Sequence, residues 1–262
     1  AQRTRDNMLA AFEDADHEKM EEIRNRVDAI VENPATAQNL KAWYRQLCKR
    51  PCFHDSYLQA FNLPGTRLID TDGMGVERIT PAGVVVAGVE YPLDCLIYAS
   101  GFEVGTEYRR RAGFDLAGRN GLRLSQHWKD GMRTRHGIHV HGFPNAFFVQ
   151  PTQGANLISN VPHNLTEAGR TIAVMVRHAL DNGLREIEVT REAEDEWVSL
   201  LLTSVGRMTG GADCTPGYYN NEGQDAGMAP RLAVGYPAGA AAYFKYIDEW
   251  RRSGRFEGLA FR

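Results

Sequence analysis

The sequence predicts an α/β fold, because patterns typical of helices and patterns typical of buried strands both occur in it. Apolar residues recur at helical spacing in four long segments, which cover residues 7–32, 162–182, 191–205 and 238–252. Short segments rich in β-branched and apolar residues lie within positions 67–99. The run Cys95–Ala99 is apolar throughout, as in a strand of a parallel sheet that is covered on both faces.

The first 47 residues predict helices without a sheet. The expected apolar face of the first helix consists of Met20, Ile23, Val27 and Ile30. Asn33 is a good helix cap and Pro34 suits the first helical position, so we expect a second helix to begin there and to include Leu47. Residues 1–47 are therefore predicted to form a helical segment.

The middle of the chain predicts several short strands. We expect them at 67–71, 76–80, 84–87, 95–99 and 146–150. Pro81–Gly83 should form a turn between two of them. Cys95 lies in an apolar run, so we expect its side chain to be buried like a small hydrophobic residue.

The C-terminal part predicts helices with defined ends. Pro162 stands near the first turn of the helix expected at 162–182, and Asn182–Gly183 supplies its C-terminal stop. Thr190 is the expected cap of the helix at 191–205. Residues 206–237 are rich in Gly, Pro, Asn and Tyr, which predicts a long ordered loop of the kind that is commonly functional.

The composition is that of an ordinary globular protein, with a hydrophobic fraction of 43% and a charged fraction of 24%. The net charge of -3 gives no reason to expect nucleic acid or an anionic membrane as a partner. No apolar stretch approaches the ~20 residues of a membrane helix. The sequence contains no G-x-G-x-x-G, so no dinucleotide fingerprint opens a strand-turn-helix unit.

The cysteines and histidines predict no metal site. The four cysteines form no C-x-x-C pair, and without a visible secretory signal we expect them to be thiols in a reducing cytoplasm. His139 and His141 would share one face of a strand and could form a metal pair. Because no third ligand is evident nearby, we expect no metal there.

The run Cys48–Asp55 holds the residues with the most specific chemistry. Arg50 is permanently charged and offers several donors, so it could stabilise an anion during catalysis; the alternative is a surface ion pair. Taken by itself, Lys49 is most simply a solvated lysine. His54 and Asp55 could act as an acid/base pair, although a structural hydrogen bond is the simpler interpretation.

Six segments together resemble the type I Baeyer–Villiger monooxygenases, which are the class B flavoprotein monooxygenases. They are Asn33–Ala37, Trp43–Cys52, Tyr57–Asn62, Leu93–Phe102, Gly142–Phe148 and Cys214–Gly223. The similarity extends over nearly the whole chain and matches the C-terminal half of such an enzyme. The glycine motifs for FAD and NADPH belong to the N-terminal half of the family and are absent here.

The resemblance implies a partial flavoprotein fold with two dinucleotide-binding domains. Residues 1–47 would be a helical segment inserted in the NADP-binding domain. Residues 48–95 would be the C-terminal part of that domain, and residues 96–262 the C-terminal part of the FAD-binding domain. Gly101 would lie at the hinge between the two domains.

The resemblance also implies an activity that needs FAD and NADPH. Such an enzyme inserts one oxygen atom from molecular oxygen next to a ketone carbonyl and forms an ester or a lactone. This chain would be a split or fragment chain that is inactive alone, and its partner would be a polypeptide carrying the N-terminal glycine motifs. The alternatives are a related flavin N- or S-oxygenase, or a non-catalytic half that acts as a binding or assembly module.

The same resemblance assigns roles to individual residues. Arg50 would be the catalytic arginine that holds a peroxide in its anionic form, and Lys49 would contact the 2′-phosphate of NADPH. Asn160 and Val161, at the start of the helix that contains Pro162, would lie near the flavin. Many family members carry a tryptophan in the 206–237 loop; here Tyr218 and Tyr219 could take over its contact with the cofactor.

Overall fold

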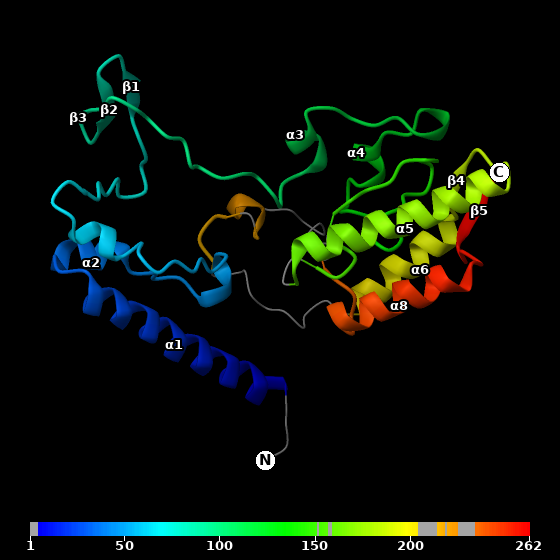
Figure 1. Cartoon of the computed structure of the whole chain (residues 1–262), viewed down its shortest axis with the longest axis horizontal. Coiled ribbons are helices and arrows are strands. Elements are labelled where there is room, and N and C mark those ends of the chain that lie inside the picture. The colour runs from blue at the N-terminus through cyan, green and yellow to red at the C-terminus, as the bar shows by residue number, and fades with distance from the viewer. Residues whose placement is uncertain (1–4, 151, 157–158, 204–213, 218, 225–233) are drawn as a thin grey trace. The chain divides into compact units, whose positions relative to one another are not determined.

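The computed structural model divides into two compact units. The first consists of Ala1–Glu103 with Asp213–Tyr219, and the second consists of Val104–Ala212 with Asn220–Arg262 (Figure 1). The residues that the structure describes are 5–150, 152–156, 159–203, 214–217, 219–224 and 234–262.

Two helices open the first unit. Helix α1 spans Arg5–Ile30 and helix α2 spans Pro34–Leu40, and the Asn33 side chain accepts a hydrogen bond from the backbone N–H of Thr36 at 3.0 Å. This cap and the proline after it confirm the predicted start of the second helix. The small core between these elements contains Val27, Val31 and Ala37, with Leu40, Leu58 and Phe61 packed against them.

The second helix is shorter than the sequence predicted. Lys41 has an extended backbone, so α2 ends at Leu40 and does not reach Leu47. The guanidinium of Arg24 donates to the carbonyl oxygen of Ala42 at 2.9 Å and lies over the ring of Trp43, and these contacts hold the chain after α2 in its extended course. Two short 3₁₀ helices follow, η1 at Gln46–Cys48 and η2 at Gln59–Asn62.

A three-stranded antiparallel sheet completes the first unit. Its strands are β1 (Arg78–Thr80), β2 (Gly83–Val86) and β3 (Val89–Pro92), in the order β1-β2-β3. Strand β1 lies within the strand predicted at 76–80, and β2 overlaps the one predicted at 84–87 but begins one residue earlier, at Gly83. The turn at Pro81 is confirmed because Thr80 Oγ1 accepts from the N–H groups of Ala82 and Gly83. The sequence missed β3 and placed a strand at 67–71 where the structure has none.

The apolar run Cys95–Ala99 does not form the predicted buried strand. Its residues are in no strand, Ile97 and Tyr98 are 83% and 72% exposed, and Cys95 is an exposed free cysteine. A strand requires a neighbour to pair with its backbone groups, and no strand among the described residues pairs with this segment. The predictions of a covered strand and of a buried Cys95 are therefore wrong for this chain.

Three long helices form the core of the second unit. They are α5 (Val161–Asp181), α6 (Arg191–Leu202) and α8 (Ala240–Ser253), which confirm three predicted helices (Figure 1). Their facing side chains include Met175, Leu201 and Ile247, all of which are fully buried, with Trp197 and Trp250. Thr190 caps α6 as predicted, since its side chain accepts from the N–H of Ala193.

Short elements surround this helical core. Strands β4 (Ile187–Val189) and β5 (Leu259–Phe261) pair antiparallel, and helices α3 (Tyr108–Ala112) and α4 (Leu124–His127) precede α5. The 3₁₀ helices are η3 at Arg119–Gly121 and η4 at Asn221–Gly223. The strand predicted at 146–150 is reduced to a single bridge between His139 and Phe147.

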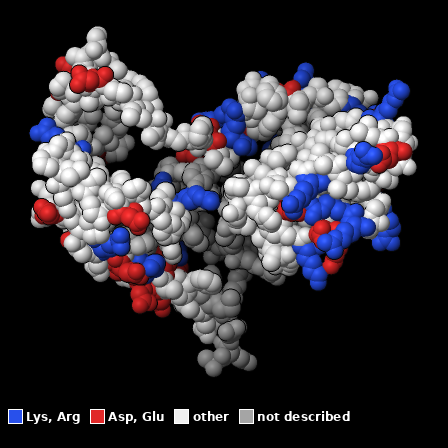
Figure 2. Space-filling model, viewed as in Figure 1, with Lys and Arg blue, Asp and Glu red and all other residues white. Residues whose placement is uncertain are grey.

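Charged side chains of both signs are interspersed on the face drawn in Figure 2. Ion pairs along helices are one reason, for example Arg177 with Asp181 at 2.8 Å and Arg252 with Asp248 at 2.9 Å. In the part of the chain that the structure describes, no helix has the length and the apolar composition needed to cross a bilayer.

Candidate functional site

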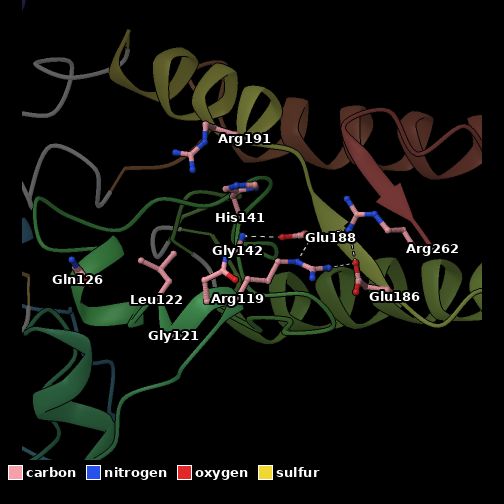
Figure 3. A pocket seen from close by; sticks show the side chains of 11 residues that line it. Arg119, Gly121, Leu122, Gln126, His141, Gly142, Glu186, Glu188, Arg191 and Arg262 are labelled. Atoms are coloured by element: carbon pink, nitrogen blue, oxygen red, sulfur yellow. Dashed lines mark hydrogen bonds and ion pairs between the residues drawn. The ribbon is translucent and has the colours of Figure 1, made fainter.

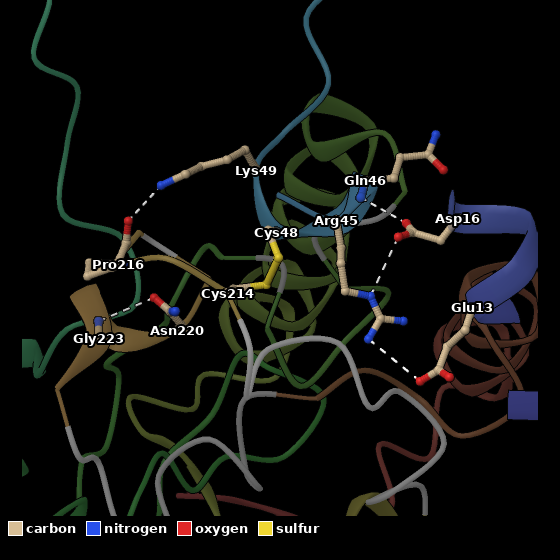
Figure 4. Close-up of a disulfide and its surroundings, with 10 residues drawn as sticks. All are labelled: Glu13, Asp16, Arg45, Gln46, Cys48, Lys49, Cys214, Pro216, Asn220 and Gly223. Atoms are coloured by element: carbon tan, nitrogen blue, oxygen red, sulfur yellow. Dashed lines mark hydrogen bonds and ion pairs between the residues drawn. A yellow bond between two sulfur atoms is a disulfide. The ribbon is translucent and has the colours of Figure 1, made fainter. Parts of the chain in front are cut away.

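A disulfide joins the segment of Arg50 to a distant part of the first unit. Cys48 and Cys214 are bonded although 166 residues separate them in the sequence (Figure 4). The prediction that all four cysteines are thiols is therefore wrong for these two, while Cys52 and Cys95 are free and exposed. Nothing in the cysteine spacing could have revealed the pair, because its partners meet only through the fold.

Lys49 and Arg50 both contact the segment that contains Tyr219. The ammonium group of Lys49 donates to the carbonyl oxygen of Pro216 at 2.6 Å. Nη1 of Arg50 lies 3.5 Å from the hydroxyl oxygen of Tyr219. Both basic side chains thus approach the 214–219 segment, which carries the aromatic residue expected beside the cofactor. Tyr218, the other predicted tyrosine, lies outside the described residues.

Residues of helix α1 hold the backbone that leads to Lys49 and Arg50. A carboxylate oxygen of Asp16 accepts from the backbone N–H of Gln46 at 2.8 Å, at the start of η1 (Figure 4). Its other carboxylate oxygen lies 3.5 Å from Nε of Arg45, whose guanidinium also lies near Glu13. The backbone immediately before Cys48 is therefore tied to a long helix, which limits the positions that Lys49 and Arg50 can take.

His54 makes a structural hydrogen bond, as the simpler interpretation of the His54–Asp55 pair had it. Its Nδ1 accepts from the backbone N–H of Ser56 at 3.0 Å, which stabilises the turn there. His54 and Asp55 are both exposed. The structure therefore gives this pair a role in the local turn.

Asn160 and Val161 form the start of α5, in the second unit. Asn160 is exposed, and its side-chain oxygen accepts from the N–H of His163 at 3.0 Å. Pro162 has no N–H, so Val161 and Asn160 supply the groups that a ligand at this helix start could meet. The first turn carries no acidic residue, and the positive end of the helix dipole is therefore not neutralised there.

Buried hydrogen bonds hold the residues before this helix. The amide nitrogen of Asn164 donates to the carbonyl oxygen of Asn156 at 2.9 Å and to the hydroxyl of Ser159 at 2.8 Å. The Ser159 hydroxyl in turn donates to the carbonyl oxygen of Asn156 at 2.9 Å. Because Asn164 is buried, this network fixes the direction from which the chain enters α5.

The histidines around Ile138 are packing residues. His136 and His139 are buried, and burial followed by the charge of Arg135 lowers the pKa of His139 to about 3. The Nδ1 atom of His141 lies 3.0 Å from the carbonyl oxygen of Val189. In the portion of the chain described by the structure, no three metal-ligating side chains gather at one place.

An open pocket of about 830 Å³ lies in the second unit and contains none of the predicted site residues (Figure 3). Arg119 and Arg262 each form an ion pair with Glu186 and with Glu188 along one side of it. Hydrogen bonds from Arg262 and Arg119 keep the pKa of Glu186 below its usual range. These opposite charges pair with one another, so the cluster fastens β4 to the C-terminus.

Similar proteins are flavoprotein monooxygenases. Pentalenolactone D synthase of Streptomyces exfoliatus is 47% identical over 255 residues, which are 96% of this chain and 43% of that protein. An FAD-binding monooxygenase of Hypomyces subiculosus is 44% identical over 246 residues, 93% of this chain and 40% of that protein. A Baeyer–Villiger monooxygenase of Streptomyces coelicolor is 44% identical over 256 residues, 97% of this chain and 42% of that protein.

The solved structures that are similar to this chain are monooxygenases too. The chain matches a polycyclic ketone monooxygenase from Thermothelomyces thermophila with a TM-score of 0.85 and 36% identity, over 100% of this chain and 43% of that one. It matches a cyclohexanone monooxygenase variant from Rhodococcus sp. Phi1 bound to NADP⁺ with a TM-score of 0.73 and 26% identity, over 95% of this chain and 45% of that one. No protein-family model matches the sequence.

The chain spans less than half the length of these relatives. Baeyer–Villiger monooxygenases are among its homologues and its structural neighbours, and the chain matches a part of their length; this is the family that the sequence motifs indicated. The mixed helix and sheet architecture is accordingly a part of that flavoprotein fold.

Proposed function

We propose that this chain supplies the C-terminal part of an FAD- and NADPH-dependent Baeyer–Villiger monooxygenase that inserts one oxygen atom next to a ketone carbonyl. The observation that carries the proposal is the identity of 44–47% to such monooxygenases, sustained over 96–97% of the chain. Identity at this level across two units favours a shared activity over a shared fold alone. One relative of known structure is a polycyclic ketone monooxygenase, so polycyclic ketones are the first substrates to try.

The described residues fit both cofactors. NADPH supplies a hydride to FAD, and reduced FAD supplies the electrons that activate oxygen. Lys49 is a cation that remains partly exposed beside the 214–219 segment, so it can meet the 2′-phosphate of NADPH as a point charge. Asn160 and Val161, at a helix start without acidic neighbours, would favour negative charge on the flavin ring.

Arg50 would act as the catalytic residue. Its guanidinium cannot lose its proton at neutral pH, so it would hold negative charge on the reacting oxygen without neutralising it. Tyr219, 3.5 Å away, would help to orient the guanidinium and would contact the cofactor with its ring. Tyr218 is proposed to share that contact. Loss of one preorganised charge of this kind costs about 100- to 1000-fold in rate.

The proposed partner is a polypeptide segment that carries the N-terminal glycine motifs, either in the same chain or as a separate subunit. The exposed apolar residues from Leu96 to Val104 would pack against it, because isolated apolar patches of this kind mark interaction surfaces. We assign residues 1–47 to an insertion in the NADP-binding domain, 48–95 to the end of that domain, and 96–262 to the FAD-binding domain. The cytoplasm is the proposed compartment.

The test is an assay of the chain combined with the N-terminal part of a relative, in the presence of FAD and NADPH. We expect ketone-dependent NADPH oxidation and an ester or lactone that carries one ¹⁸O atom from ¹⁸O₂. Arg50→Ala should lower turnover about 100- to 1000-fold. Arg50→Lys should also be impaired, since an ammonium lacks the fork of donors. Arg78→Ala, in the exposed strand β1, is the matched control and should leave turnover unchanged.

Three outcomes would contradict the proposal. Oxidation of amines or sulfides without ketones would favour an N- or S-oxygenase. A colourless complex that binds no FAD would favour a non-catalytic assembly half. Full activity of Arg50→Ala would remove Arg50 from the mechanism.

A further inference from the structure

Three cross-links converge on the two basic residues of the proposed site. The covalent one is the disulfide from Cys48, which directly precedes Lys49 and Arg50 in the chain, to Cys214 (Figure 4). The others are the hydrogen bond from Lys49 to the carbonyl oxygen of Pro216 and the contact of Arg50 with the hydroxyl of Tyr219. All three connect residues 48–50 to residues 214–219, and both segments belong to the first unit.

We infer that the Cys48–Cys214 disulfide is a reversible positioning device that holds Lys49 and Arg50 against the 214–219 segment, so that thiol reductants switch the enzyme to a poorly coupled state. This inference rests on the proposed function, because it needs Lys49 and Arg50 at the cofactors. The residues it adds are Cys48 and Cys214, which touch neither substrate nor cofactor and act through their neighbours in the chain.

The covalent link fixes the distance between the two segments more firmly than the hydrogen bonds of Lys49 and Arg50 do. The Lys49 hydrogen bond is exposed, and an exposed hydrogen bond exchanges readily with water. The Arg50–Tyr219 distance of 3.5 Å is at the long limit for a hydrogen bond. Arg50 is one residue from Lys49 and two from Cys48, so a displacement of Cys48 moves both basic side chains. A misplacement of about 1 Å in an active site can lower the rate about 100-fold.

The two cysteines of the disulfide differ in solvent exposure, and this difference decides which sulfur atom a reductant attacks first. Cys48 is buried, at 4% exposure, whereas Cys214 is half-buried. A dithiol reductant would therefore attack the sulfur of Cys214, form a mixed disulfide with it and release Cys48 as a thiolate. The second thiol of the reductant then displaces Cys214. Two electrons and two protons pass to the protein, the protein S–S bond breaks, and the reductant leaves as its own disulfide.

If the chain functions in the cytoplasm, as proposed, we expect the Cys48–Cys214 disulfide to form and break reversibly. Disulfides in a reducing cytoplasm are commonly transient or redox-sensing. The loop that the bond closes comprises most of the chain, yet the bond is placed beside the two residues with assigned cofactor roles. A bond that served only to staple the fold would have no reason to lie next to Lys49 and Arg50.

The first measurement establishes the redox state. The FAD-loaded enzyme is equilibrated with dithiothreitol and its disulfide at set ratios, quenched with acid, denatured and alkylated, and its peptides are weighed by mass spectrometry. We expect alkylation of Cys52 and Cys95 alone in the oxidised form, and of Cys48 and Cys214 as well after reduction. Absence of the Cys48–Cys214 cross-link under oxidising conditions would overturn the inference.

The second measurement separates positioning from simple stability. After reduction, we expect the KM for NADPH to rise, kcat to fall about 10- to 100-fold, and more NADPH to be spent on hydrogen peroxide than on ester. A merely structural bond would lower the fraction of active enzyme and leave the KM and the coupling unchanged. Reoxidation should restore both values, which unfolding and aggregation would not allow.

Variants provide the controls. The pair Cys48→Ser with Cys214→Ser should reproduce the reduced state and should no longer respond to dithiothreitol, which excludes an effect of the reductant on the flavin. Cys52→Ser, at an exposed thiol in the same segment, should behave as the unmodified enzyme. If Arg50→Ala abolishes turnover while reduction leaves the KM for NADPH and the coupling unchanged, the positioning device is wrong and the proposed function stands. If Arg50→Ala has no effect, both are wrong.

Discussion

His139 illustrates, at the scale of one residue, how burial beside a positive charge can make the stability of the fold depend on pH. It is 2% exposed, its ring packs edge-on against Phe147, and its Nε2 has no hydrogen-bond partner among the described residues. Burial, with the nearby charge of Arg135, lowers its pKa to about 3. The folded chain therefore keeps this imidazole neutral at pH values at which an unfolded chain would protonate it.

This depressed pKa predicts a loss of stability in acid. A histidine whose folded pKa lies below its unfolded value stabilises the fold fully above the unfolded pKa of about 6.5, and that stability is lost as the pH falls toward the folded pKa. Between pH 7.5 and pH 5.0 we expect His139 to contribute a loss of about 2 kcal/mol in the free energy of unfolding. Urea denaturation at the two pH values measures it.

The matched variant is His139→Leu, which retains an apolar side chain at the site. Its free energy of unfolding should fall by about 2 kcal/mol less than that of the unmodified chain over the same pH interval. An equal acid loss in the His139→Leu chain would show that the fold does not lower the pKa of His139.

At the scale of elements, a buried ion pair joins two of the long helices of the second unit. The guanidinium of Arg251 on α8 donates to the carboxylate of Glu167 on α5 at 2.7 Å, and these side chains are only 9% and 8% exposed. Burial raises the pKa of Glu167, but the hydrogen bonds and charges of Arg251 and, to a smaller extent, of Arg170 outweigh it and leave the pKa lowered. The same guanidinium reaches Thr171 Oγ1 at 3.3 Å.

Removal of one partner should cost more than removal of both. Arg251→Met leaves a buried carboxylate with less compensation, so we expect the free energy of unfolding to fall by about 3–5 kcal/mol. The double change Arg251→Met with Glu167→Gln should recover most of that loss, since no buried charge remains. Thermal or urea denaturation of the unmodified chain, the two single variants and the double variant gives the coupling energy between Arg251 and Glu167.

Arg252 is the control in the same turn of α8. Its side chain is 79% exposed and pairs with Asp248, and exposed pairs contribute little. Arg252→Met should therefore leave the midpoint of unfolding unchanged. A loss for Arg251→Met no larger than that for Arg252→Met would mean that water reaches the Glu167 carboxylate.

At the scale of the whole molecule, the sequence predicted those elements that are determined by residues close together in the chain. The long helices follow from a period of about 3.6 residues and from caps such as Asn33 and Thr190, whose partners lie three residues away. Helix α2 was predicted too long because Arg24, on another helix, binds the carbonyl of Ala42 and draws the chain out. Such a contact cannot be read from the residues around Ala42.

In the proposed site, too, some features could be predicted from the sequence and others could not. The family resemblance assigned cofactor roles to Lys49, Arg50 and Tyr219, but it did not state the contacts that bring these residues together in the structure. The Cys48–Cys214 bond did not follow, because no local pattern encodes a pairing across most of the chain. The exposure of Cys95 was missed because an apolar run indicates only that the segment should be covered. It does not indicate which part of which polypeptide covers it.

That uncovered segment leads to a prediction about assembly. The residues from Leu96 to Val104 include five large apolar side chains that are exposed, namely Leu96, Ile97, Tyr98, Phe102 and Val104. If the N-terminal part of the enzyme adds a strand beside them, their amides should exchange with solvent rapidly in the chain alone and at least about 100-fold more slowly in the complex. Hydrogen exchange with mass spectrometry measures both, and the Cys95 thiol should become resistant to alkylation in parallel.

Ile97→Asp tests whether burial of this segment drives the association. Burial of an isoleucine side chain contributes about 1.5–3 kcal/mol, and burial of an unpaired carboxylate costs more, so affinity for the N-terminal part should fall at least about 100-fold. Leu180→Asp, at an exposed apolar position near the end of α5, should leave affinity unchanged. Equal affinity of the Ile97→Asp chain, with the amides of residues 96–104 still exchanging rapidly in the complex, would place the strand partner elsewhere and leave residues 96–104 as surface.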